Sequence, residues 1–240
     1  MIGPPVSAKA IFRQLLTRWG GFALLVVVIA AIHPAVPSAQ MPSLSGAWHP
    51  DEALEVYAVS INYPKPFDRP YTLYGVYLGH GAVLTAAHVV GRRDLLVNPM
   101  VRVAAHDVSA KVLRKGSFEQ NDLALLFVDE TRVPLKLRMR RNMQLCATIP
   151  KIGTNVVIAY PDRTVRSRII SPILIGNVAE RKKFNTLIND VQVSGSGVFD
   201  PERRCLLGIM SASVRIHSYQ RLSERAGYFV PAAKINLIEP

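Results

Sequence analysis

Short hydrophobic runs, separated by turn-forming clusters, recur along the chain from Val56 to Val230. Each run has the length of a β-strand, about 4–8 residues, and Pro, Asn and Asp gather between the runs. Helical turns are expected only at Ala86–Val90 and near Ala232–Ile238. This pattern is typical of an all-β barrel or sandwich. The runs are Val56–Val59, Tyr71–Leu78, Gly81–Leu84, Leu95–Val97, Met100–Ala105, Ala110–Leu113, Leu123–Val128, Asn155–Ala159, Arg168–Ile170, Ile173–Ile175, Val191–Val193, Gly197–Phe199, Leu206–Met210 and Tyr228–Val230.

The runs fall into two halves of similar rhythm, without a sequence repeat between them. A basic stretch, Lys136–Arg141, separates the halves and is interpreted as an exposed, solvated connector. We therefore predict a first β-rich unit over residues 55–135, a connector over 136–143 and a second β-rich unit with a C-terminal tail over 144–240.

The N-terminal segment has the pattern of a secretory signal. Three basic residues precede an apolar run from Gly20 to Ile32, which Pro34 ends. The run is shorter than the roughly 20 apolar residues that a membrane-spanning helix needs. We predict a signal peptide over residues 1–38, cleaved after Ser38, with an uncleaved signal anchor as the alternative, and a polar linker over 39–54. The protein is thus expected to be exported, to the periplasm or the extracellular space.

The chain is strongly basic, with a net charge of +12. Such a surface can attract nucleic acid, anionic lipid or cell-wall polymer. No zinc-finger spacing or aromatic RNA-binding motif supports a nucleic-acid partner, so none is expected. The charge is interpreted mostly as solvated surface. Membrane association, through the basic surface or an uncleaved N-terminal segment, stays an alternative.

Cys146 and Cys205 are the two cysteines of the chain. In an exported protein, two cysteines favour one disulfide, and this one would close a long loop. Two buried free thiols are the alternative. The two cysteines and the scattered histidines lack the spacing of metal ligands, so neither a metal nor another cofactor is expected.

Three segments carry residue types that together suit acyl transfer. Thr85-Ala86-Ala87-His88 ends a hydrophobic run, Asn121–Leu126 puts Asp122 at the start of an apolar strand, and Gln192–Asp200 holds two serines among small residues. A serine becomes a good nucleophile when a base takes its proton, and imidazole titrates near neutral pH. A buried carboxylate fixes the imidazole tautomer and stabilises the imidazolium that forms.

In this order, the three segments resemble the motifs of the trypsin/chymotrypsin-like serine proteases, and their pattern is nearest to the bacterial HtrA-like trypsin-like peptidases without a PDZ domain. The resemblance covers the chain from about Val56 to Ile235. It implies an all-β, chymotrypsin-like fold of two Greek-key six-stranded β-barrels with a short C-terminal helix. The β-rich units 55–135 and 144–240 would be these barrels. It also implies a catalytic triad of His88, Asp122 and a serine.

Ser194 and Ser196 are the two candidates for the nucleophile. In the family, a glycine and two small residues or a proline follow the nucleophile, and an apolar pair comes next. Ser194 fits this pattern up to the apolar pair that begins at Val198, whereas Ser196 would put Val198 where a small residue is expected. We therefore favour Ser194 and keep Ser196 as the alternative.

The resemblance assigns the oxyanion-hole donors to the backbone N–H groups of Gln192 and Ser194. The chain departs from the family at this turn, because Gln192 replaces the usual glycine and Val193 replaces the usual Asp or Asn. This departure puts catalytic activity in question and motivates a second functional hypothesis.

The resemblance also implies residues that bind substrate. Ser211 would hydrogen-bond the catalytic aspartate, and Ala212 and Ser213 would pair with a bound peptide as an added strand. Gly227 belongs to the last wall of the substrate pocket, and Ile188 falls near its floor. Because Ile188 is not acidic, an apolar or small residue is expected before the cleaved bond.

Histidines and acids outside the motifs are interpreted as structural or solvated. Asp107 is placed in a polar turn, and Asp129 and Asp200 are expected to end strands in solvent. The histidines concerned are His49, His80, His106 and His217.

The first functional hypothesis is an exported serine endopeptidase that cleaves peptide bonds of a protein or peptide substrate through a Ser-His-Asp triad and an acyl-enzyme. The alternative is a catalytically weak or inactive protease-fold protein of the cell envelope that binds a peptide or partner.

Overall fold

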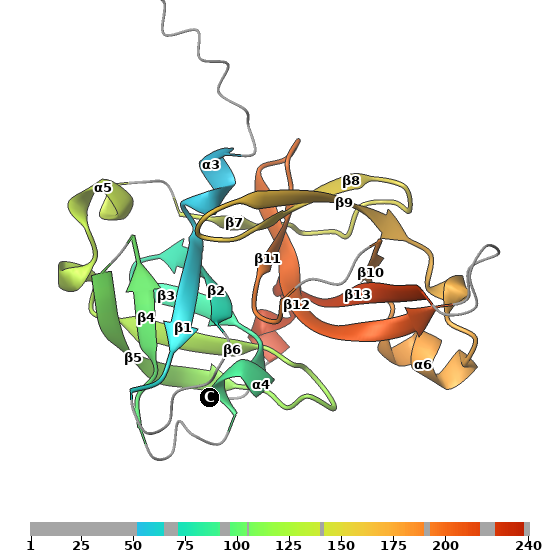
Figure 1. Cartoon of the computed structure of the whole chain (residues 1–240), viewed down its shortest axis with the longest axis horizontal. Helices are drawn as coiled ribbons and strands as arrows, with labels where there is room; N and C mark the ends of the chain where they lie inside the picture. The colour runs from blue at the N-terminus through green and yellow to red at the C-terminus, as the bar shows by residue number, and fades with distance from the viewer. Residues whose placement is uncertain are drawn as a thin grey trace, which may run out of the picture. The chain divides into compact units, whose positions relative to one another are not determined.

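Antiparallel strands dominate the regular secondary structure of the protein, a computed structural model that describes residues 52–64, 72–91, 97–104, 106–139, 142–189, 193–216 and 224–237 (Figure 1). These residues all belong to one unit of the chain, Ala47–Pro240. The predicted signal peptide and most of the predicted linker lie outside the described residues. Within the described residues, no helix is long and apolar enough to cross a membrane.

The first barrel closes through six antiparallel strands in the order β1-β2-β3-β6-β5-β4. Alternate side chains of a strand point to opposite faces, so residues such as Val101 and Val103 fill the barrel while Arg102 between them faces out. The strands are β1 (Ala58–Asn62), β2 (Leu73–Gly79), β3 (Ala82–Thr85), β4 (Met100–Val103), β5 (His106–Lys115) and β6 (Ala124–Val128).

The second barrel has the order β11-β8-β9-β10-β13-β12, and the pairing of β11 with β12 closes it. A short strand, β7, joins β12 in parallel. Counted in chain order, the strands of both barrels are arranged 1-2-3-6-5-4, which places the fourth beside the first as in a Greek key. The strands are β7 (Gln144–Leu145), β8 (Asn155–Ala159), β9 (Thr164–Ile170), β10 (Leu187–Ile188), β11 (Gly197–Asp200), β12 (Cys205–Ile216) and β13 (Glu224–Pro231). The predicted all-β fold of two six-stranded Greek-key barrels is confirmed.

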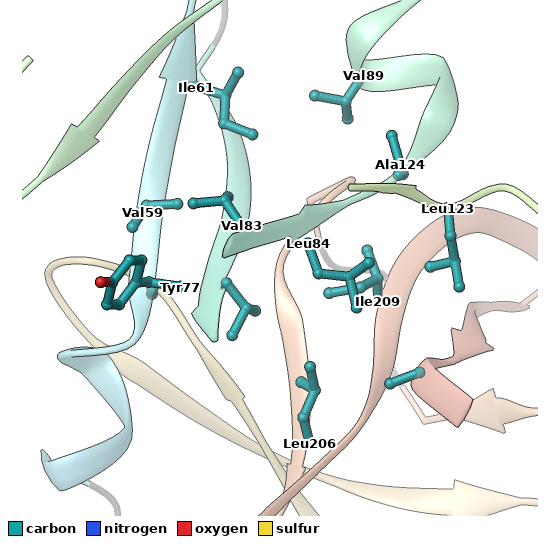
Figure 2. Close-up of a cluster of buried hydrophobic side chains, with 14 of the residues drawn as sticks. Val59, Ile61, Tyr77, Val83, Leu84, Val89, Leu123, Ala124, Leu206 and Ile209 are labelled. Atoms are coloured by element: carbon teal, nitrogen blue, oxygen red, sulfur yellow. The ribbon is translucent and has the colours of Figure 1, made fainter. Parts of the chain in front are cut away.

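One hydrophobic cluster runs through the first barrel and continues into the second. Figure 2 shows part of it, with Leu206 and Ile209 of β12 among residues of the first barrel. Each fully buried Val, Leu or Ile side chain contributes about 1.5–3 kcal/mol to the free energy of unfolding. A second cluster, which includes Ile158, Val198 and Phe229, fills the second barrel. The shared cluster ties the two barrels together.

Short helical segments connect the strands. The turn expected at Ala86–Val90 is the helix α4 (Ala87–Val90), and the expected C-terminal helix is the 3-10 helix η4 (Ala232–Leu237). The strand predicted at Ile173–Ile175 is wrong, because Ser171 caps a 3-10 turn that Pro172 begins. The other segments are α3 (Glu52–Glu55), η2 (Glu130–Arg132), α5 (Leu135–Arg138), η3 (Pro172–Leu174) and α6 (Val178–Lys183).

For two acidic residues, the structure shows an environment that differs from the prediction. Asp107 belongs to β5, not to a turn, and both of its carboxylate oxygens accept hydrogen bonds of 2.8 Å from the Arg102 guanidinium, which lower the pKa of Asp107. Asp200 is 3% exposed, not solvated, because its Oδ1 accepts the backbone N–H groups of Glu202 and Arg203, each at 3.0 Å. Asp107 is thus paired with a side chain on the neighbouring strand, whereas Asp200 fixes the backbone of the turn after β11.

The other acids and histidines outside the motifs lie mostly in solvent. Asp129 is exposed, and its carboxylate accepts the N–H of Thr131 at the start of η2. His80 and His106 are exposed as well. His49 and His217 lie outside the described residues.

Cys146 and Cys205 form the predicted disulfide, so the alternative of two free thiols is wrong. Both are 6% exposed, and the bridge links the residue after β7 to the first residue of β12. A loop of 59 residues closed in this way stabilises the fold by about 4 kcal/mol in the chain-entropy model.

Candidate active site

His88 lies in a short helix that is anchored at both ends. The strand β3 ends at Thr85, whose hydroxyl donates to the Tyr74 carbonyl over 2.6 Å. The single helical turn α4 follows, and the buried hydroxyl of Tyr63 donates to the carbonyl of Val90 at its end over 2.9 Å. The side chain of His88 is 31% exposed, so its ring faces solvent from a fixed backbone.

Asp122 precedes β6 and holds His88 through two contacts. Its Oδ1 accepts the backbone N–H of His88 at 2.9 Å, and its Oδ2 lies 2.6 Å from Nδ1 of the ring. A third hydrogen bond, of 2.5 Å, comes to Oδ2 from the Ser211 hydroxyl. Because an ionised carboxylate only accepts, Nδ1 carries the proton and Nε2 of His88 is left as an acceptor.

The carboxylate of Asp122 is 2% exposed, and its environment favours the charged form. Burial raises the pKa of this group, but the hydrogen bonds from His88 and Ser211 outweigh burial and hold its pKa below the ordinary value. Asp122 is therefore ionised at neutral pH and stabilises a positive charge on His88.

Ser211 reaches Asp122 because of an irregularity in β12. The ladder with β13 pairs Met210 with Phe229 and Ala212 with Tyr228, so Ser211 is the extra residue of a β-bulge. A bulge bends its strand and redirects the side chain of the extra residue. The Ser211 hydroxyl is thereby brought from the second barrel to an aspartate of the first.

Ser194 lies in a tight turn that requires the glycine after it. Gly195 has a φ of 87°, and a Cβ at this position would lie 2.0 Å from the carbonyl oxygen of Tyr74. The N–H of Gly195 donates to the Met210 carbonyl over 2.8 Å. The turn leaves Ser194 partly exposed, and its hydroxyl donates to the Ser211 carbonyl over 3.2 Å. Among the described residues, no hydrogen bond joins this hydroxyl to His88.

Ser196 occupies a different environment from Ser194. It is 0% exposed, and its hydroxyl donates to the Val193 carbonyl over 2.6 Å. Its backbone N–H donates to the same carbonyl over 3.2 Å. The Ser196 hydroxyl is thus buried and engaged in packing the turn, whereas that of Ser194 is accessible.

Only one of the two predicted oxyanion-hole donors lies within the described residues. In this part of the chain no backbone acceptor is found for the Ser194 N–H. Gln192 lies outside it. Val193 is 40% exposed, and its carbonyl accepts hydrogen bonds from the hydroxyl and the N–H of Ser196.

The strand β12 has an open edge beside the serine. On one side Ala212 and Ser213 pair with β13. On the other, β11 reaches as far as Ile209, and beyond Ile209 no described strand pairs with this edge. Ser213 is exposed and Ala212 half-buried, so the backbone is accessible to an extended peptide.

Gly227 and Ile188 meet behind this edge. Gly227 of β13 pairs with Ser213 on one side and with Ile188 of β10 on the other. Ile188 is 0% exposed and belongs to the hydrophobic cluster inside the second barrel. Both residues of β10 are fully buried, so the side chain of Ile188 packs inside the second barrel.

Sequence patterns gave no indication of an aromatic residue beside the histidine. The Phe118 ring, 44% exposed, meets the His88 ring edge-on with their centroids 5.9 Å apart. Tyr228 lies close enough to Asp122 that the negative charge, together with burial as the larger cause, raises the pKa of Tyr228 to about 12. A hydrophobic residue in an otherwise polar loop was the only signal for Phe118.

Comparisons with known proteins agree with this geometry at the level of the fold. No protein-family model matches the chain, and no curated protein does. The inactive form of the Rv3671c protease from M. tuberculosis is 20% identical, with a TM-score of 0.54 over 78% of this chain and 89% of that one. A serine endoprotease from Yersinia pestis is 18% identical, with a TM-score of 0.54 over 78% of this chain and 63% of its own length.

A third solved structure has the same architecture. Kallikrein-related peptidase 10 is 19% identical, with a TM-score of 0.51 over 76% of this chain and 92% of that one. At such identities the likeness concerns the backbone. It agrees with the two closed barrels and with the strand order found in each. The chain therefore has the two-barrel fold of the chymotrypsin-like serine proteases.

Proposed function

We propose that the protein is a serine endopeptidase with Ser194 as nucleophile, His88 as general base and Asp122 as the residue that orients His88. The observation that carries the proposal is the set of hydrogen bonds around Asp122, which fixes the backbone, ring and tautomer of His88. The accessible hydroxyl of Ser194 and the glycine-dependent turn that presents it also support this assignment.

The reaction begins when the Ser194 hydroxyl turns from the Ser211 carbonyl to Nε2 of His88. Oγ attacks the carbonyl carbon of the peptide bond while Nε2 takes the proton, and ionised Asp122 stabilises the imidazolium. The N–H of Ser194, with that of Gln192, donates to the oxyanion. His88 then gives the proton to the leaving amine, and water hydrolyses the acyl-enzyme by the same route.

The substrate is an extended segment of a protein or peptide, added as a strand to the open edge of β12 at Ala212 and Ser213. The protein acts after export, as the N-terminal sequence pattern predicts. The disulfide agrees with this compartment, because such bonds persist mainly in oxidising environments.

Labelling with a fluorophosphonate probe tests the assignment of the nucleophile. Wild-type protein should be labelled, Ser194→Ala should not, and Ser196→Ala should keep labelling if it folds, as judged by its melting temperature. An unlabelled wild-type protein would contradict the proposal, and loss of labelling in Ser196→Ala alone would move the nucleophile to that residue.

The second candidate function is peptide or partner binding without catalysis. It is favoured by Gln192 and Val193, which replace the residues usual in the family, and by the Ser194 hydroxyl, which donates to Ser211. It predicts peptide binding that survives His88→Ala, with no turnover at any pH. Turnover by wild-type protein that His88→Ala abolishes would exclude it.

A further inference from the structure

A pocket of about 410 Å³ adjoins the side of the site where Asp122 lies. Asp122 and Ser211 form part of its wall, and the rest comes from the loop before β6, from α6, from β13 and from η4. Ser211 also begins the open edge of β12, and Tyr228, another wall residue, pairs with Ala212 in the ladder. A side chain of a peptide held on that edge therefore has this pocket next to it.

Aromatic rings form two sides of the pocket. Phe184 and Tyr228 meet edge-on with their centroids 5.0 Å apart, and Phe118 lies opposite the second barrel on the loop before β6. The phenol of Tyr228, with its raised pKa of about 12, is neutral at physiological pH. These walls offer apolar contact to the methylene groups of a side chain and add no negative charge.

Lys183 of α6 lies between the two aromatic walls. Its Nζ is 5.2 Å from the centroid of Phe118 and 5.5 Å from that of Phe184. The same Nζ lies 2.9 Å from Oε2 of Glu119, on the loop that carries Phe118. Lys183 thus connects the second barrel to the loop of the first barrel that contacts His88.

The charges that face the pocket leave it positive. Lys182, Lys183 and Lys234 line it, against Glu119 and Asp122. The carboxylate of Asp122 is engaged by His88 and Ser211, and so is not available to these lysines. The side chain of Glu119 is 77% exposed, and ion pairs this exposed contribute little to stability. Another carboxylate can therefore take the place of Glu119 on Lys183 at little cost.

We propose that this pocket binds the side chain of an Asp or Glu residue of the peptide on β12, with Lys183 as the specificity-determining residue and the peptide carboxylate replacing that of Glu119. Phe118 and Phe184 pack against the methylene groups of the acidic residue. The proposal deepens the proposed function and rests on the peptide site of that function, since it needs a peptide on the edge of β12.

Fluorescence anisotropy with Ser194→Ala protein tests the pocket without turnover. The probes are labelled ten-residue peptides of one neutral sequence in which a single Glu, or a Gln in its place, is moved through the positions. We expect Glu to bind about tenfold more tightly than Gln at one position, which corresponds to about 1.4 kcal/mol. The preference should fall to less than twofold with Lys183→Met, survive with Lys183→Arg, and increase with Glu119→Gln.

Lys111→Met is the matched control, because this lysine is exposed on β5 and does not line the pocket. It should leave the preference unchanged, and melting temperatures should show that each variant is folded. Equal binding of Glu and Gln at every position, or no binding of any peptide, would overturn the proposal. So would a preference that Lys183→Met leaves intact.

Cleavage of the same peptides by wild-type protein separates this proposal from the function on which it rests. Preferential binding of acidic peptides without cleavage would leave the pocket assigned and refute the endopeptidase. Cleavage that is indifferent to Glu, together with equal binding of Glu and Gln, would support the endopeptidase and refute the pocket assignment.

Discussion

The first and second barrels follow the same strand order, yet they hold their parts of the site by different means. In the first barrel, His88 and Asp122 are fixed by a set of hydrogen bonds to each other and to Ser211. In the second, Ser194 depends on the backbone conformation of Gly195, and its hydroxyl donates to Ser211 rather than to His88. In the proposed mechanism the base, His88, is therefore preset, whereas the nucleophile, Ser194, must rotate before it reacts.

Because of this difference, substitutions in the two barrels should have different effects. Changes in the first barrel should act on the chemistry, through the tautomer and charge of His88. Changes in the second should act on the fold and on the turn that presents Ser194. Four variants, one of them a double substitution, test this division, in order of decreasing expected effect.

Asp122→Asn should have the largest effect. An amide can donate to Nδ1 of His88 and so favour the tautomer in which Nε2 carries the proton and cannot accept that of Ser194. In a Ser-His-Asp enzyme the corresponding change lowers kcat by about 10⁴, and we expect a loss of that order in peptide hydrolysis. A loss of less than tenfold would show that Asp122 does not set the tautomer.

Removing the disulfide should act on stability rather than on chemistry. The double substitution Cys146→Ser and Cys205→Ser should lower the free energy of unfolding by about 4 kcal/mol. Without the disulfide, the unfolded chain regains the conformational entropy of the long loop. Urea denaturation measures this loss, with the single variants as controls. A loss below about 1 kcal/mol would mean that native contacts alone hold β7 and β12 together.

Gly195→Ala tests the turn that presents the nucleophile. The left-handed conformation costs an alanine about 1–2 kcal/mol, and the overlap with the Tyr74 carbonyl adds about 1–3 kcal/mol. We expect lower stability together with loss of fluorophosphonate labelling. Gly153→Ala is the matched control, since Gly153 has a φ of 90° but nothing within 4 Å of its Cβ. It should cost about 1–2 kcal/mol and keep labelling; equal losses in the two variants would contradict the role of the overlap.

Ser211→Ala should have the smallest of the four effects. It removes one hydrogen bond to the Asp122 carboxylate, worth about 1.5–3 kcal/mol, and so raises the pKa of Asp122. Because the wild-type pKa is lowered by folding, its contribution to stability is complete above the pKa of the unfolded chain and disappears as the pH falls through the folded pKa.

Unfolding measured from pH 7 downward therefore checks the Ser211→Ala variant. Its deficit in unfolding free energy should be complete at neutral pH and should shrink below about pH 4. Ser213→Ala, at an exposed position on the same strand, should show no such dependence. A deficit independent of pH would indicate that Ser211 acts by packing alone.

The parts of the fold that local patterns encode were predictable from the sequence. The strand β8 coincides with the predicted run Asn155–Ala159, because hydrophobic β-branched residues and flanking turns specify it locally. The contact between His88 and Asp122 was expected from motifs whose residues are 34 positions apart. In both cases the information lies in short stretches of sequence.

Features that depend on distant contacts were not predictable. The helix α6 is short and its residues are mostly exposed, so it leaves no amphipathic pattern, although Asn177 caps it as a start signal would. The partner of Lys183, Glu119, is 64 positions away on another barrel. The sequence predicted Ile188 near a pocket floor, and its full burial on β10, between β9 and β13, depends on distant strand pairings that the local pattern does not encode.

Successive residues of strand β12 have different structural roles. The strand begins in the disulfide at Cys205, contributes Leu206 and Ile209 to the core shared by the barrels and supplies Ser211 to Asp122. It then presents the open edge at Ala212 and Ser213 before it ends at Ile216. Inserting one residue near the start of β12 would move every later residue by one position. Side chains that face the core would then face the other side of the sheet. The spacing of Cys205, Ile209 and Ser211 along this strand is therefore constrained more tightly than the lengths of the loops around it.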